Sequence, residues 1–112
     1  MTITESKGEL TAQEKYFLTA APNIKKMRSV ANQTIDVDKW CMFMDTNKAG
    51  EENEILSIMT PEREVYATNS RTFIESFYKI VECFGTDGFS RVEICTGTSK
   101  AGREFITAVY AG

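Results

Sequence analysis

The residues with the clearest chemical potential lie in one short segment, Gly97 to Arg103, between two runs of strand-forming residues. A glycine near each end, with polar residues between them, is typical of a β-hairpin turn. The small side chains would let a phosphate approach the backbone, where Lys100 and Arg103 supply positive charge. The segment predicts a hairpin in which Ser99, Lys100 and Arg103 contact a phosphate backbone. The alternative is a solvated turn whose two charges only keep the strand edge soluble.

A second group of basic residues lies in the stretch 21–34, which has no acidic residue: Lys25, Lys26 and Arg28. The whole chain is acidic, with 13 Lys and Arg against 16 Asp and Glu and a formal net charge of −3. Positive charge is therefore concentrated locally, and such a patch can follow phosphates because salt screens the distant charges. Lys39 and Arg71 could extend the patch. A solvent-exposed strand or turn is the alternative interpretation.

Aromatic residues outside the main helix pattern offer rings on which nucleobases could stack. Trp40, next to Lys39 on an expected strand, is the first candidate, and Tyr66 is the second. A base stacked on an exposed ring contributes about 1–3 kcal/mol with little sequence preference. Packing in the core is the alternative for each of these rings.

The composition excludes most familiar enzyme designs. The chain has no histidine, so Ser-His and Cys-His catalytic pairs and histidine-ligated zinc are impossible. Its cysteines, Cys41, Cys83 and Cys95, form no CxxC pair, which indicates separate thiols in a reducing compartment. The acidic residues of 36–54 lack metal-site spacing, and a solvated charged loop explains them better. We predict a protein that is not an enzyme and has no metal or cofactor.

The first part of the chain, residues 1–23, is predicted to be an extension that precedes a single domain at 24–112. Residues 1–10 are polar, are expected to be loosely ordered, and lack the basic-then-apolar order of a signal peptide. Thr11 and Glu14 have the spacing of a capping box, which predicts a short helix that ends before the first proline. No apolar run approaches the roughly 20 residues of a membrane span, so we expect a cytoplasmic protein without membrane contact.

The domain is predicted to contain several strands around one helix. The strand-like segments, rich in β-branched and aromatic residues, lie within 24–60 and at 65–68, 91–96 and 104–110. The helix is expected to begin with a capping-box pair, Thr72 and Glu75, and to end at Gly85. Its apolar stripe predicts a main wall of the core and consists of Phe73, Ile74, Phe77, Ile80, Val81 and Phe84.

Three strand regions, one helix and a closing hairpin follow the element order of an OB-fold, a small five-stranded Greek-key barrel. The predicted fold class is therefore mainly β with one core helix (α+β). We expect an OB-like five-stranded barrel with the helix between strands 3 and 4 and a short N-terminal helix. In this fold the loop between the last two strands, here residues 97–103, commonly contacts single-stranded nucleic acid.

A further pattern combines residues 66–70 and 97–105 with Thr72, Phe73, Phe77, Phe84 and Gly85. In this combination the sequence resembles the small single-stranded DNA-binding proteins of tailed phages and related mobile elements, over about residues 34–110. The resemblance implies an OB-like domain that coats replication or recombination intermediates cooperatively and with little sequence preference. By position, it also implies that Ser99, Lys100 and Arg103 contact the DNA backbone.

The sequence therefore predicts a non-catalytic single-stranded DNA-binding protein of phage or mobile-element DNA replication or recombination, located in the host cytoplasm. The expected DNA contacts are Lys25, Lys26, Arg28, Lys39, Trp40, Tyr66, Arg71, Ser99, Lys100 and Arg103. The alternative is a small protein-interaction module that inhibits a host or defence enzyme, with the acidic residues 51–54 meeting a basic cleft of the partner. One continuous basic groove would favour DNA, and scattered basic residues beside an acidic face would favour inhibition. Self-association along the strand is left open.

Overall fold

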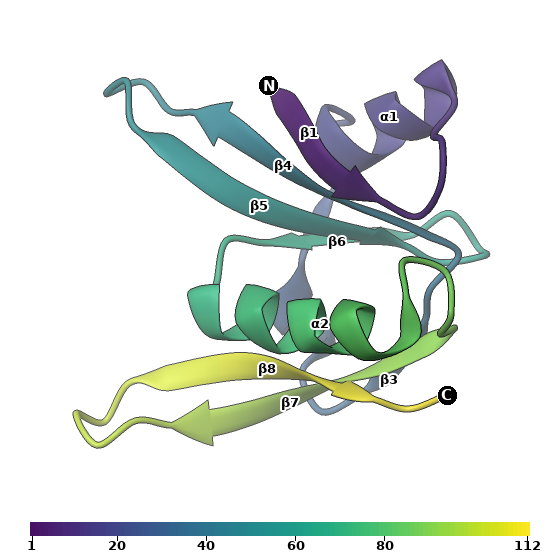
Figure 1. Ribbon diagram of the computed structural model, residues 1–112. Coiled ribbons are helices and arrows are strands. Elements are labelled where there is room, and N and C mark those ends of the chain that lie inside the picture. The colour runs from purple at the N-terminus through teal and green to yellow at the C-terminus, as the bar shows by residue number, and fades with distance from the viewer.

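The computed structural model describes residues 1–112 and contains eight β-strands, two α-helices and one short 3₁₀ helix (Figure 1). In chain order the elements are β1 (Thr2–Ser6), α1 (Ala12–Thr19), β2 (Lys25–Lys26), η1 (Met27–Val30), β3 (Thr34–Asp36), β4 (Lys39–Thr46), β5 (Glu52–Met59), β6 (Val65–Thr68), α2 (Arg71–Phe84), β7 (Arg91–Thr98) and β8 (Glu104–Tyr110). The protein is thus mainly β with two helices, which confirms the predicted fold class at this level.

The strands form two sheets. The five-stranded sheet has the order β1-β4-β5-β6-β2, and the three-stranded sheet has the order β3-β7-β8. Neighbouring strands are antiparallel except β2 and β6, which are parallel. No closed barrel is formed, because the second neighbour of β6 is the short β2 and not β8.

One bent segment joins the two sheets. β3 pairs with β7, and the chain then continues as β4 beside β5. At the bend, the Val37 N–H donates to the Ser90 carbonyl at 2.8 Å, whereas the Asp38 N–H donates to the Met59 carbonyl at 2.9 Å. Consecutive residues therefore bond to different sheets, and the two sheets curve around one shared core.

Helix α2 lies between the two sheets (Figure 1). Most of its predicted stripe is buried in one core with residues of both sheets: Phe73, Ile74, Phe77, Ile80 and Val81. Phe84 is the exception and contradicts its assignment to the core, since 42% of its surface is exposed. It lies in the last turn of the helix, where its ring reaches the molecular surface and stacks on that of Tyr110, with 4.1 Å between the ring centroids.

The start of α2 differs from the predicted capping box. The helix begins at Arg71, and the Ser70 hydroxyl accepts the Phe73 N–H at 3.4 Å. Thr72 lies in the first turn and donates its hydroxyl proton to the Ile106 carbonyl of β8 at 2.9 Å. The prediction of a pair between Thr72 and Glu75 was therefore wrong, because Ser70 is the N-cap and Thr72 bonds to a neighbouring strand.

A second hydroxyl of α2 reaches the same strand. The Ala108 N–H of β8 donates to Ser76 Oγ at 2.8 Å, and Ser76 Oγ donates to the Phe73 carbonyl at 2.9 Å. Together with the bond from Thr72 to Ile106, this contact satisfies backbone groups on the edge of β8 that does not face β7. Side chains of α2 thus bond to the free edge of β8.

Helix α1 covers the outer face of the five-stranded sheet. The predicted capping box is present, with the Glu14 N–H donating to Thr11 Oγ1 at 3.1 Å and the Thr11 N–H donating to Glu14 Oε1 at 2.8 Å. Beneath the helix lies a second apolar cluster of Leu18, Cys41, Phe43, Met59 and Val65.

Residues 1–10 are not loosely ordered, contrary to the prediction, because Thr2–Ser6 form the edge strand β1 beside β4. The sequence of β1 is polar since an edge strand with one solvated face needs few apolar residues. Residues 1–23 thus supply an edge strand and a covering helix to the same sheet that continues in the later chain.

Candidate nucleic-acid interface

A hollow of about 560 Å³ lies between β6 and β8, which belong to different sheets. Its lining residues come from β2, η1, β5, β6, the two residues before α2, and β8: Lys26, Met27, Arg28, Ile55, Ala67, Thr68, Asn69, Ser70 and Ile106. Since β5 and β8 each belong to a long hairpin, the hollow lies between the two hairpins, which both project to the left in Figure 1. We call this hollow the inter-hairpin cleft.

Two cations of the cleft are positioned by a short local structure. β2 contains only Lys25 and Lys26, which lie opposite Tyr66 and Ala67 of β6 and remain exposed. The 3₁₀ helix η1 follows at once and is anchored by the buried Met27 and Val30. This arrangement leaves Arg28 exposed beside β8, with its Nη1 4.0 Å from the Glu104 carboxylate.

Lys25 and Tyr66 lie together, but Lys25 already has a partner. Its ammonium group donates to the Glu64 carboxylate at 2.6 Å and lies 5.9 Å from the Tyr66 ring centroid. The hydrogen bond to Glu64 and the charge of that carboxylate raise the pKa of Lys25. Lys25 is therefore a cation whose charge is balanced within the protein, and it does not line the cleft.

Lys39 and Arg71 are not brought to the cleft. Lys39 lies near α1, with its ammonium group 4.0 Å from the Glu14 carboxylate. The pKa of Glu14 is lowered, mainly by the hydrogen bond from the Thr11 N–H and further by the charge of Lys39. Arg71 lines a different hollow, together with Glu52 and Glu54.

Trp40 does not offer an exposed ring, so its expected role in base stacking was wrong. The side chain is fully buried and packs edge to face on Phe77, with 5.0 Å between the ring centroids. Its indole N–H donates to the Thr86 carbonyl at 2.9 Å, which satisfies its only polar atom. The physical reason is that β4 is a central strand, covered by α2 on one face and by α1 on the other.

The β7–β8 hairpin presents its two cations as the sequence indicated. The turn is closed by bonds from the Ser99 N–H to the Arg103 carbonyl at 2.8 Å and from the Gly102 N–H to the Ser99 carbonyl at 2.9 Å. Ser99 Oγ accepts the Arg103 N–H at 3.2 Å, so this hydroxyl also shapes the turn. Lys100 and Arg103 are exposed and take part in none of the four ion pairs of the structure.

Phe105 is a candidate that the sequence reasoning did not assign to the site. It is half-buried and lies opposite Gly97 in the hairpin, and a Cβ at position 97 would be 2.6 Å from Phe105 Cζ. The ring thus covers the glycine backbone. Because side chains alternate along a strand, Phe105 lies on the face of β8 opposite to Ile106. Arg103 lies two residues earlier, directly before the strand begins. The sequence signal that could have identified Phe105 is an aromatic residue two positions after Arg103, placed opposite a glycine in the expected hairpin.

Two of the three cysteine thiols have raised pKa values. Burial raises the pKa of the Cys41 thiol to about 12, and partial burial near Glu93 raises that of Cys95, so both thiols stay protonated at neutral pH. No group of three or more Cys, Asp or Glu side chains is placed to hold a metal ion.

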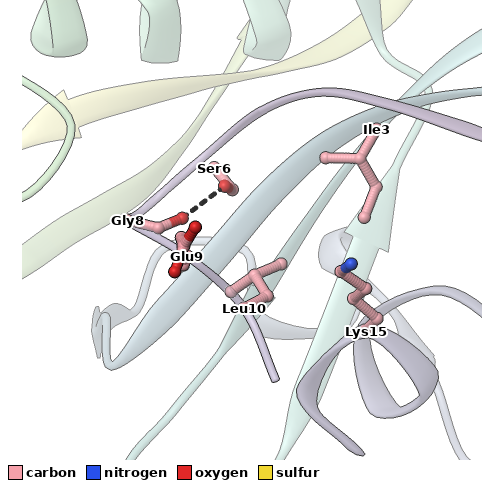
Figure 2. Close-up of a pocket in the computed structure, with 6 residues that line it drawn as sticks. All are labelled: Ile3, Ser6, Gly8, Glu9, Leu10 and Lys15. Carbon is pink, nitrogen blue, oxygen red and sulfur yellow. Dashed lines mark hydrogen bonds between the residues drawn. The ribbon is translucent and has the colours of Figure 1, made fainter. Parts of the chain in front are cut away.

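A separate hollow of about 430 Å³ lies between β1, the following loop and α1 (Figure 2). Its polar groups are the Glu9 carboxylate, the Lys15 amine and the Ser6 hydroxyl, which donates to the Gly8 carbonyl at 2.7 Å.

Comparison with known protein families, with curated proteins and with solved structures finds no match for this chain. None of the helices has the length and apolar character needed to cross a membrane.

Proposed function

We propose that this protein binds single-stranded DNA without catalysis, in the replication or recombination of phage or mobile-element DNA. The observation that carries the proposal is the inter-hairpin cleft, which has Lys26 and Arg28 along it and, at the tip of the β7–β8 hairpin, Lys100 and Arg103. Exposed cations along a hollow attract phosphates and release counterions on binding.

The proposed DNA path uses the basic side of the cleft. Thr68, Asn69 and Ser70 offer hydroxyl, amide and backbone groups to phosphates or base edges, while Ile55 and Ile106 offer apolar surface to the bases. From the cleft the strand passes the hairpin tip, where one base stacks on Phe105 on the outer face of β8. The tip of the β4–β5 hairpin is acidic, with Glu51 and Glu52, so the phosphates stay on the opposite wall.

An open OB-like barrel is the fold proposed with this function. When β3 and β4 are taken as one bent strand, the pairing order is β8-β7-β3/β4-β5-β6, with α2 between the third and fourth of these strands along the chain. That order supports an OB-like topology whose last pairing, between β6 and β8, is replaced by hydroxyl contacts from α2. In such barrels the loop between the last two strands contacts single strands.

The direct test is the anisotropy of a labelled oligo-dT of a few tens of nucleotides at several salt concentrations. Each phosphate contact on a single strand contributes about −0.7 to the slope of log K against log salt, so four cations give about −3. The variant Lys100→Glu/Arg103→Glu should weaken binding for every sequence and reduce this slope by about 1.4.

Lys15→Glu, on the far helix α1, is the matched control for the single variant Lys100→Glu and should leave the affinity unchanged. Equal affinities of the hairpin variant and the wild type would remove the hairpin from the site. Because Trp40 is buried, we expect its fluorescence to change little on binding, so anisotropy is the better readout.

A further inference from the structure

A second groove runs between β5 and α2. It consists of two adjoining hollows of about 390 and 150 Å³, which share Glu54 and Ile74. Asn69 lines both this groove and the inter-hairpin cleft, so the two lie side by side. We call it the acidic groove, after four of its lining residues: Glu52 and Glu54 of β5, and Glu75 and Glu82 of α2.

The charges of the acidic groove are not balanced within the protein. The four glutamates are exposed, and none of them belongs to an ion pair, although Arg71 and Lys79 also line the groove. Four carboxylates against two cations leave an excess of two negative charges. Both walls carry carboxylates, so a ligand in the groove meets negative charge from β5 and from α2.

Apolar surface lies between these carboxylates. Ile74 is buried at the point where the two hollows meet, and Tyr78, one helical turn further on, has 42% of its surface exposed. An exposed aromatic ring beside an aliphatic side chain can hold one large apolar side chain. Phosphate groups are repelled by the same four carboxylates, so the groove does not suit nucleic acid.

We propose that the acidic groove binds a basic segment of a partner protein, in which Lys or Arg residues flank a large apolar side chain. The apolar side chain contacts Ile74 and Tyr78, and the flanking cations pair with the glutamates of both walls. This surface adjoins the inter-hairpin cleft at Asn69, but its four glutamates and Tyr78 are not among the proposed DNA contacts, so the proposal does not depend on DNA binding. It is also the kind of surface that a protein-interaction module needs.

The test uses the full chain and a short fluorescein-labelled peptide, acetylated and amidated, with arginines on both sides of a leucine pair. A matched peptide carries serines in place of the leucines. We expect the leucine peptide to bind more tightly and to shift the backbone amide resonances of residues 52–54 and 71–82 in an NMR titration.

Matched variants distinguish peptide binding in the acidic groove from non-specific electrostatic attraction to an acidic protein. Glu75→Lys should weaken peptide binding about tenfold, whereas Glu62→Lys, an identical charge change in the exposed turn before β6, should leave it within about twofold. Tyr78→Ala should weaken binding and Tyr16→Ala, an exposed ring on α1, should not. Thermal melts of all four variants check that each is folded.

Several results would overturn the proposal. They are the absence of binding by the leucine peptide, equal binding of the two peptides, equal losses in Glu75→Lys and Glu62→Lys, or shifts confined to other elements. Sedimentation of the protein alone tests the competing occupant, a second copy of the chain. Self-association that is lost in Glu75→Lys but kept in Glu62→Lys would assign the groove to that contact instead.

Discussion

Phe105 lies over Gly97 because the register of β7 and β8 places the two residues opposite each other. The glycine leaves room for the ring, and the ring shields the backbone of the glycine. Arg103, directly before β8, and Phe105, in the strand, therefore offer a cation and an aromatic ring two residues apart, which is the combination that proteins use for phosphate and base contacts with single strands.

If this ring stacks on a base, Phe105→Ala should weaken binding of oligo-dT by about 1–3 kcal/mol. Gly97→Ala should also weaken it, because the new Cβ would lie 2.6 Å from Phe105 Cζ and displace the ring. The anisotropy titration described above measures both effects, with Tyr16→Ala as the aromatic control. Unchanged affinity in Phe105→Ala would remove the ring from the binding site.

Cys41 gives a prediction for stability at alkaline pH. The thiol is buried in the cluster beneath α1, and burial raises its pKa from 9.0 to about 12. Above pH 9 the unfolded chain loses this proton while the folded chain keeps it, so the thiol lowers the free energy of unfolding progressively from about pH 9 to about pH 12. The free energy of unfolding, measured by urea denaturation across this pH range, should fall more steeply in the wild type than in Cys41→Ala. If the free energy of unfolding has the same pH dependence in both proteins, the raised pKa of Cys41 is contradicted.

At the scale of elements, α2 does more than fill the core, because Thr72 and Ser76 bond to the edge of β8. In Ser76→Ala the buried Ala108 N–H would lose its acceptor, and we expect the free energy of unfolding to fall by about 1–3 kcal/mol. Ser29→Ala is the control, since the Ser29 hydroxyl bonds at an exposed site and its loss should change stability by less than about 0.5 kcal/mol. Urea denaturation measures both free energies of unfolding. Equal values for the two variants would show that the hydrogen bond from β8 to Ser76 does not stabilise the protein.

The elements that sequence patterns predicted well are those that form largely from local signals. The stripe of α2, the capping box of α1 and the strand at 104–110 all depend on spacing within one segment. β1 was missed because it is stabilised by pairing with a distant strand, β4. Trp40 was misjudged for a related reason, since whether a strand is central or at an edge depends on the whole sheet.

For the candidate site, the hairpin cations could be predicted from the sequence and the remaining geometry could not. Lys100 and Arg103 are exposed because a turn projects its side chains into solvent. The partners of Lys25 and Lys39, in contrast, are Glu64 and Glu14, which only the folded chain brings near. Ion pairs between distant segments leave no pattern in one sequence.

At the scale of the molecule, charge is divided between two neighbouring surfaces. The inter-hairpin cleft has cations along it, the acidic groove has carboxylates on both walls, and Asn69 lies at the border. A net charge of −3 therefore describes neither surface. This division allows one small chain to hold an anionic strand on one surface and a cationic partner on the next.

The central claim is that single-stranded DNA occupies the inter-hairpin cleft. An NMR titration of the labelled protein with unlabelled oligo-dT tests it most directly, because it locates the bound strand residue by residue. We predict shifts in the amide resonances of Lys26, Arg28, 68–70 and 99–105, with little change in α1 and in the outer half of α2. Shifts confined to α1 or to the acidic groove, or no shifts at saturating DNA, would contradict the account.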